Sequence, residues 1–236
     1  MPLAVHGVTH QGRRATNEDA FLVDRDRGLF VVADGMGGHN AGEVASGLAV
    51  KAIGEFLSDG APPSLNLLDE ALRVANDQIL TVAAQEPDYA GMGTTVVAAL
   101  LTDGEAIYAN VGDSRMYLWR SGRLTQLTRD DSWVSAALEG VSEGAREIGQ
   151  HPMRHVLTKV VGLRPELQPS VAACGFGVGD VLLLCSDGVH GSVPDAALAE
   201  LLGRGRTVAE IAGSVVHDAI ARGATDNVTA IVVRRE

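Results

Sequence analysis

The stretch TTVVAALLTDGEAIYANVGDSRMYLWRSGRLTQL, residues 94–127, decides the fold class of this chain. It contains four apolar segments that are separated only by the pairs Asp103-Gly104, Gly112-Asp113 and Ser121-Gly122. Such pairs are typical of tight turns, because glycine and short polar residues accept the backbone conformations that turns require. A parallel crossover needs a dozen or more residues, so these closely spaced strands must pair antiparallel.

Segments with helical spacing flank this stretch on both sides. Apolar residues recur every three or four positions in four segments, at residues 41–57, 64–82, 193–202 and 208–221. Shorter apolar runs predict further strands at residues 21–24, 29–33, 181–185 and 228–233. Runs of strands and pairs of helices, instead of strict alternation, indicate an α+β protein. We therefore predict a four-layer α-β-β-α sandwich, in which two stacked antiparallel sheets are flanked by helix pairs that bury every apolar stripe.

The composition is that of a globular protein. With 236 residues, 46% of them hydrophobic, the chain is long enough for our prediction of a single domain over residues 1–236. A net charge of −11 argues against nucleic acid and anionic membranes as partners, because both reward clustered Lys and Arg. Cys174 and Cys185 lie in apolar stretches, and no apolar run is long enough to cross a bilayer. We therefore expect a cytoplasmic protein with reduced thiols and no signal peptide.

Acidic residues recur at the ends of the predicted strands, several of them beside glycine. They are Glu18, Asp19, Asp34, Asp113, Asp187 and Asp226. One such residue is usually part of a turn or a helix cap, but six gathered together would repel strongly without a counter-charge. Oxygen ligands suit Mg²⁺, Mn²⁺ or Ca²⁺ better than zinc, and glycine allows a main-chain carbonyl to approach an ion. Arg14 could bind an anionic oxygen pair such as a phosphate, so the pattern indicates phosphoryl chemistry.

Seven segments in order resemble one known family. They are GRRATNEDAF, VVADGMGGHNAGEVAS, GMGTTVVAAL, VGDSRMYL, LTRDDS, LLLCSDGV and ATDNVTAIVV. Together they resemble the metal-dependent protein Ser/Thr phosphatases (PPM, or type 2C) in their bacterial form, over residues 7–233. The resemblance implies a β-sandwich flanked by helix pairs, which agrees with the independent prediction above.

The resemblance also implies a role for each acidic residue. Two Mn²⁺ or Mg²⁺ ions would be bridged by Asp34 and bound by the carbonyl of Gly35, by Asp187 and by Asp226. Glu18 and Asp19 would hold water molecules on the ions, and Asp113 with Asp187 would form a third, weaker ion site. Arg14 would bind the substrate phosphate, and Asn227 would support the centre. The catalytic residues are then Arg14, Asp34, Asp187 and Asp226.

The implied reaction is hydrolysis of phosphoserine or phosphothreonine on proteins by a metal-activated bridging hydroxide. The protein would oppose a bacterial Ser/Thr kinase and would act as a monomer. Cys185 is not needed as a nucleophile, because an apolar strand raises the pKa of a thiol.

Three features depart from the family pattern or vary within it. Met36 stands where eukaryotic relatives have a histidine proposed as the general acid, so water is expected to protonate the leaving group, with His39 as a rival donor. Asp130-Asp131 stands where the family often has Asp-His. A variable flap is expected at residues 132–155, with a short helix starting at residues 142–146. We expect none of the seven histidines to bind an ion.

Three alternatives remain open at this point. A silent phosphoprotein-binding module on the same fold should lack one of the ion-binding aspartates, yet Asp34, Asp187 and Asp226 are all present. A phosphatase dedicated to one partner is a second alternative. A metal-dependent nuclease is a third alternative, because it also uses two metal ions, but the acidic composition of the chain argues against nucleic acid as a substrate.

Overall fold

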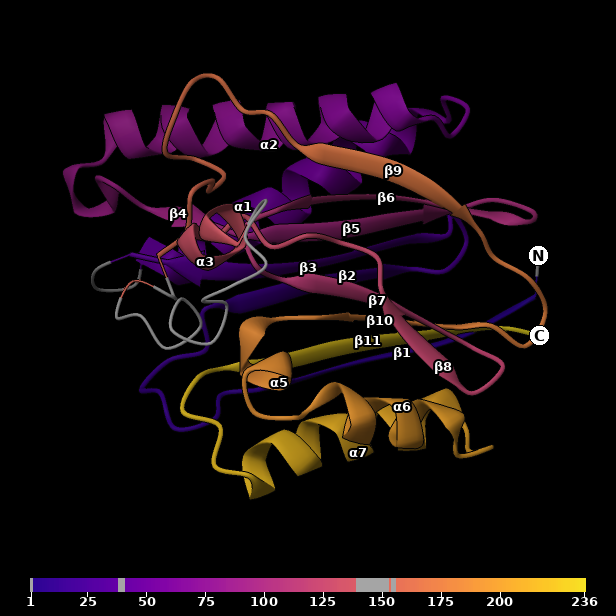
Figure 1. The fold of residues 1–236 in the computed structure, drawn as a ribbon. Helices are drawn as coiled ribbons and strands as arrows, with labels where there is room; N and C mark the ends of the chain where they lie inside the picture. The colour runs from indigo at the N-terminus through magenta and orange to yellow at the C-terminus, as the bar shows by residue number, and fades with distance from the viewer. Residues whose placement is uncertain (1, 38–40, 139–152, 154–155) are drawn as a thin grey trace.

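Two antiparallel sheets form the centre of the protein, in a computed structural model that describes residues 2–37, 41–138, 153 and 156–236 (Figure 1). The first sheet has the order β1 (Leu3–His10), β11 (Val228–Arg235), β10 (Val181–Cys185), β7 (Arg115–Arg120) and β8 (Arg123–Gln126). The second has the order β2 (Asp19–Asp24), β3 (Leu29–Met36), β5 (Val96–Leu101), β6 (Glu105–Val111) and β9 (Ser170–Gly175). The short strand β4 (Gly93–Thr94) pairs with the end of β3.

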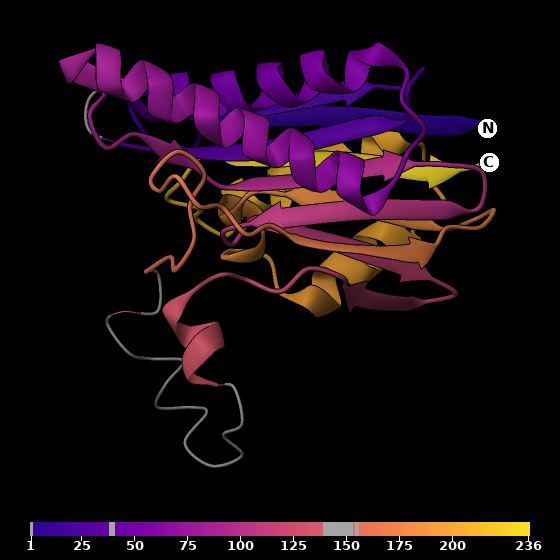
Figure 2. The same ribbon diagram turned by 90° about the horizontal axis from the view of Figure 1, so that it is seen from above.

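Helix pairs cover the outer faces of both sheets. Figure 1 shows α1 (Ala41–Phe56) and α2 (Leu65–Gln85) over the second sheet, and α6 (Asp195–Gly203) and α7 (Val208–Ala221) over the first. Seen from above in Figure 2, the sheets lie between the two helix layers. Short helices complete the described chain: η1 (Leu57–Asp59), η2 (Pro87–Tyr89), α3 (Trp133–Ala137) and α5 (Asp187–His190). The predicted four-layer α+β sandwich is confirmed. One predicted pairing is wrong: the strands on either side of Gly112-Asp113, β6 and β7, do not pair, because the chain crosses from the second sheet to the first at this turn.

Three apolar cores hold the layers together. Alternate side chains along a strand belong to different cores, because they point to opposite faces of the sheet. In β3, Val31 and Ala33 face α1 and α2, whereas Phe30 and Val32 face the opposite sheet. This is the pattern expected when successive side chains of a strand point to opposite faces. A third core lies between the first sheet and the helices α6 and α7. Since both faces of the central strands are buried, their sequences read as continuous apolar runs.

The local details follow from ordinary capping and turn chemistry. Ser64 caps α2 as expected from its position, because its Oγ accepts a hydrogen bond from the Leu67 amide at 3.1 Å. Helix α6 begins at Asp195, two residues later than predicted, because Pro194 occupies its N-cap. In the described ranges, no helix has the length and apolar character required to span a membrane.

Strands β1 and β9 and the helix α5 are among the elements that the sequence did not predict. Strand β1 was missed because His6, Gly7 and His10 interrupt its apolar residues, and the edge strand β9 was missed because it is only partly buried. The short helix α5 follows β10 where a turn was expected. The helix start predicted at residues 142–146 and most of the predicted flap lie outside the described residues, as do His39, His151 and His155.

Candidate metal and phosphate site

Strand pairing brings the first two predicted carboxylates together. Asp19 at the start of β2 lies directly opposite Asp34 near the end of β3. Directly opposite residues in an antiparallel pair have Cβ atoms about 5 Å apart. The main chain of Asp34 is fixed by Thr95, whose amide donates to the Asp34 carbonyl at 2.9 Å and whose Oγ1 accepts from the Asp34 amide at 3.1 Å. Both carboxylates therefore have defined positions on the second sheet.

The first sheet supplies carboxylates at the ends of its own strands. Asp187 starts α5 just after β10, and Asp226 lies two residues before β11. The hydroxyl of Ser186 connects the two sheets, because it donates to Asp19 Oδ2 at 2.7 Å while accepting from the Thr229 amide at 3.1 Å. Asp113 lies in the turn between β6 and β7.

Burial and the charges of neighbouring carboxylates make Asp19, Asp34 and Asp113 unusually basic. Burial, followed by the charges of Asp19, Asp187, Asp113 and Asp226, raises the pKa of Asp34 well above its ordinary value. Burial also raises the pKa of Asp19 to about 6, and burial together with Asp187 raises that of Asp113 to about 7. Ionised carboxylates in this arrangement require a compensating positive charge.

Glu18 lies beside this group, where burial raises the pKa of its carboxyl and the Arg14 charge lowers it. Its main chain is held by Asn227, whose Oδ1 accepts from the Glu18 amide at 2.8 Å. The Asn227 side-chain amide also donates to the carbonyls of Gln11 and Thr16 at 2.8 and 2.9 Å. Asn227 therefore fixes the loop that carries Arg14 and Glu18.

Arg14 lies against Asp226, with Nη2 at 2.6 Å from Oδ2. This hydrogen bond raises the pKa of the guanidinium, so Arg14 remains a cation. The Arg14 side chain is 56% exposed, and a guanidinium has five N–H donors, so one bond to Asp226 leaves donors for an anion. A salt bridge is the ordinary role of a lone arginine, and the sequence did not identify Asp226 as the partner of Arg14; the exposed guanidinium retains the capacity for the predicted phosphate contact.

The chemistry of these residues fits hard divalent ions. Asp19 Oδ1 is buried without a hydrogen bond from any described residue. The donors at the site are carboxylate and carbonyl oxygens, which Mg²⁺ and Mn²⁺ prefer. In the described part of the chain, no three Asp, Glu, His or Cys side chains converge as a closed ligand set for one ion. Asp19, Asp113, Asp187 and Asp226 are nevertheless close enough to Asp34 to raise its pKa. An incomplete protein ligand set of this kind suits Mg²⁺ or Mn²⁺ ions that keep water ligands.

Gly35 has a packing role in addition to its predicted ion contact. A Cβ on Gly35 would lie 2.0 Å from the Gly42 carbonyl oxygen, and one on Gly42 would lie 2.8 Å from Glu18 Cδ. Glycine at both positions therefore lets the start of α1 approach the end of β3 beside Glu18. Met36, the next residue, is 40% exposed and carries no proton to donate.

Several supporting residues were missed by sequence reasoning. Arg115 forms a bidentate pair with Asp130 through Nε and Nη2, at 2.8 and 2.7 Å. Asp131 accepts from the Gly112 amide at 3.2 Å and pairs with Lys159 at 2.9 Å. His190 Nε2 lies 2.9 Å from the Asp113 carbonyl. In the sequence, the one signal for these supporting contacts is that Arg115 lies two residues after Asp113 and that Asp130-Asp131 is an acidic pair.

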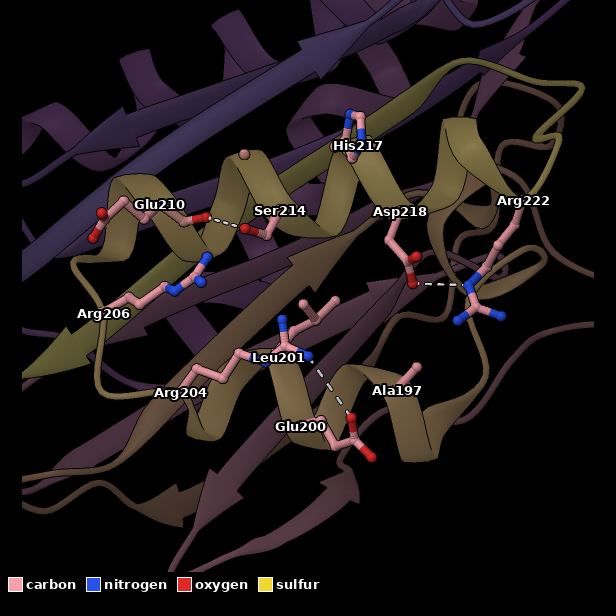
Figure 3. Close-up of a pocket in the computed structure, with 11 residues that line it drawn as sticks. Ala197, Glu200, Leu201, Arg204, Arg206, Glu210, Ser214, His217, Asp218 and Arg222 are labelled. Carbon is pink, nitrogen blue, oxygen red and sulfur yellow. Dashed lines mark hydrogen bonds and ion pairs between the residues drawn. The ribbon is translucent and has the colours of Figure 1, made fainter.

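The chain also has a pocket of about 450 Å³ between α6 and α7, which is remote from this chemistry (Figure 3). Four of its charged side chains form the ion pairs Glu200–Arg204 at 3.8 Å and Asp218–Arg222 at 2.8 Å. None of the predicted site residues lines it. Local ion pairs on exposed helices explain its charge without a ligand.

Comparison with known proteins gives one family. The family model described as protein phosphatase 2C matches residues 6–218. The serine/threonine phosphatase stp of Listeria monocytogenes is 35% identical over 237 residues, which are 97% of this chain and 94% of that protein. The serine/threonine protein phosphatase PstP of Mycobacterium tuberculosis is 39% identical over 221 residues, 93% of this chain and 42% of that longer protein.

Solved structures agree with this result. The M. tuberculosis phosphatase PstP/Ppp superposes with a TM-score of 0.91 at 37% identity, over 99% of each chain. The catalytic domain of PstP, solved in complex with two manganese ions, superposes with a TM-score of 0.84 at 35% identity, again over 99% of each chain. The resemblance found in the seven sequence segments is thereby confirmed, and the chain belongs to the protein phosphatase 2C family.

Proposed function

We propose that this protein hydrolyses phosphoserine and phosphothreonine on proteins, using divalent metal ions held among Asp34, Asp187 and Asp226. The observation that carries the proposal is the gathering of buried, mutually repelling carboxylates from both sheets, beside a half-exposed arginine. Membership of the protein phosphatase 2C family and the names of the relatives support this activity.

The proposed ion centre contains two ions, Mn²⁺ or Mg²⁺. Asp34 and the Gly35 carbonyl, with Asp187 and Asp226, would be the direct ligands, and Glu18 and Asp19 would hold coordinated water. Asp113 and Asp187 would hold a third, weaker ion. The two manganese ions of the PstP catalytic domain and the all-oxygen donor set support this assignment.

When bound, the ions would supply Lewis-acid charge that activates water and stabilises the negative charge developing on the transferred phosphoryl group. Arg14 would bind the equatorial phosphate oxygens through the guanidinium donors that Asp226 leaves available. Ser186 would keep Asp19 oriented through its hydrogen bond to Oδ2. Because Met36 has no proton to donate, the leaving alkoxide would take its proton from water.

The experiment is hydrolysis of p-nitrophenyl phosphate and of a phosphothreonine peptide with Mn²⁺, Mg²⁺ or EDTA. We expect turnover that requires an ion and falls by at least about a thousandfold in Asp187→Asn and Asp34→Asn, because a lost ligand disrupts charge stabilisation of the transition state. Glu200→Gln, on the outer face of α6, is the matched control and should keep full activity. Unchanged activity in Asp187→Asn would refute the assignment. A folded protein that binds the phosphopeptide without hydrolysing it would indicate a binding module.

We also propose that a bacterial Ser/Thr kinase of the same cell supplies the substrates, and that the protein acts as a monomer in the cytoplasm. The free thiols of Cys174 and Cys185 support a reducing compartment. Sedimentation of the purified protein would test the monomer directly.

A further inference from the structure

A histidine that the proposed reaction does not use connects two of the acidic segments. His190 is the last residue of α5, the short helix that begins with Asp187. Its Nε2 lies 2.9 Å from the main-chain carbonyl oxygen of Asp113, which is 77 positions away in the sequence. A carbonyl oxygen only accepts hydrogen bonds, so Nε2 must carry the proton. This bond therefore fixes the tautomer of His190 and leaves Nε2 unavailable as an ion ligand.

The turn around Asp113 is anchored at each of its residues. Asp131 Oδ2 accepts from the Gly112 amide at 3.2 Å, and Ser114 Oγ lies 2.7 Å from Thr95 Oγ1. Arg115, the next residue, forms the bidentate pair with Asp130. These contacts hold the neighbours of Asp113. The His190 contact holds the peptide unit of Asp113 itself, and it comes from the helix that carries Asp187.

We propose that His190 is a positioning residue, which sets the Asp113 carboxylate against Asp187 through the hydrogen bond to the Asp113 carbonyl. The inference deepens the proposed function, because it rests on Asp113 and Asp187 sharing the weaker ion. Gly112 has a φ of +95°, a conformation that other residues rarely take, so the turn that carries Asp113 depends on glycine as well as on these contacts. Partners that orient ligands typically change ion affinity by about 10- to 100-fold when they are removed.

The test compares two substitutions of the same residue. His190→Phe keeps a ring but removes the donor, whereas His190→Gln keeps an N–H at nearly the same reach. We expect the Mn²⁺ concentration that half-saturates the weakest site to rise about tenfold in His190→Phe and to stay close to wild type in His190→Gln. At saturating Mn²⁺, KM for p-nitrophenyl phosphate should not change. His190→Met removes the donor with a flexible side chain and replaces His190→Phe if that variant does not fold.

Ion binding is measured directly, by isothermal titration of the ion-free protein with Mn²⁺, so the readout does not depend on activity. In the Asp113→Ala background, His190→Phe should have no further effect, because the carboxylate that it positions is gone. His217→Phe, the same change on the exposed side of α7, is the control and should bind Mn²⁺ like wild type.

The outcomes separate the two proposals. If wild type binds Mn²⁺ and His190→Phe binds it equally well, the role of His190 is refuted while the ion site stands. An effect of His190→Phe that persists in the Asp113→Ala background would also refute it, because the histidine would then act elsewhere. If wild type binds no Mn²⁺, the ion site of the proposed function fails, and the inference fails with it.

Discussion

At the scale of single residues, ionisation of the buried Asp113 carboxyl should lower the free energy of unfolding of the ion-free protein. Burial and the Asp187 charge raise its pKa in the folded state to about 7, whereas the unfolded value is close to 3.8. The folded state therefore holds a proton that the unfolded chain has lost between these two pH values, so the free energy of unfolding falls as pH rises from about 4 to 7.

Asp113→Asn removes this ionisation. In EDTA at pH 8 we expect the variant to be more stable than wild type by about 2–4 kcal/mol, which raises Tm by several degrees. The difference should shrink as the pH falls towards 4 and vanish below the unfolded pKa of about 3.8, where the wild-type carboxyl is protonated in both states. Thermal unfolding followed by circular dichroism across this range is the measurement. A difference that does not depend on pH would contradict the explanation, and exposed Asp88→Asn is the control.

Arg14 presents a second test at the residue scale. Arg14→Ala should raise KM for a phosphopeptide by about 10- to 100-fold, because a charge-assisted contact to phosphate contributes about 1.5–3 kcal/mol. The structure adds that Arg14 also neutralises Asp226. Removing Arg14 should therefore leave the Mn²⁺ affinity equal or higher. Steady-state kinetics and Mn²⁺ titration of the same variant separate the effect on phosphopeptide KM from the effect on Mn²⁺ affinity. A fall in Mn²⁺ affinity that accounts for the kinetic change would argue against direct phosphate binding.

At the scale of elements, helix α2 holds the segment that follows the predicted flap. Asn76 is fully buried on the apolar face of α2. Its Oδ1 accepts from the Gly162 amide at 2.8 Å, and its Nδ2 donates to the Arg164 carbonyl at 3.0 Å. The same segment bridges to β4 through Val161 and Thr94, and the Thr94 hydroxyl donates to the Asp34 carbonyl at 2.9 Å. One buried amide thus anchors a segment that reaches the ion site.

Asn76→Ala should therefore destabilise the protein by about 2–4 kcal/mol, since it leaves the buried Gly162 amide without a partner and removes the hydrogen bond to the Arg164 carbonyl. The urea midpoint of unfolding should fall, with little change in the slope of the transition. Asn66→Ala, at an exposed position near the start of the same helix, should change stability by no more than about 0.5 kcal/mol. Equal effects of the two substitutions would show that the hydrogen bonds of Asn76 contribute little.

At the scale of the whole molecule, the two sheets bring their acidic strand ends to one place in a chain of net charge −11. Ions that bind only the folded state should stabilise it, by about 2.7 kcal/mol at a concentration one hundred times the dissociation constant. We expect Mn²⁺ to raise Tm by several degrees and EDTA to reverse the change. Asp34→Asn should abolish most of this shift, whereas NaCl at equal ionic strength should not reproduce it in wild type. A shift that survives in Asp34→Asn would place the stabilising ion elsewhere.

The sequence by itself determined the fold class and the candidate ligands. The closely spaced turns at Asp103-Gly104 and Ser121-Gly122 required antiparallel strands, and helical periodicity located the four long helices. These features depend on residues that are neighbours in the chain, so they can be recognised without coordinates. The order of the seven segments indicated the protein phosphatase 2C family and assigned a role to each acidic residue.

Only the tertiary structure decided how these residues are supported. The contacts of Ser186 with Asp19, of Arg14 with Asp226 and of His190 with Asp113 join positions 167, 212 and 77 residues apart. Such contacts depend on how the two sheets stack and on strand register, which local patterns do not encode. The same holds for Gly35, whose need for glycine comes from the approach of Gly42 on another element. Burial by the complete fold also sets the pKa values of Asp19, Asp34 and Asp113, because desolvation exists only once the sheets and helices have packed around them.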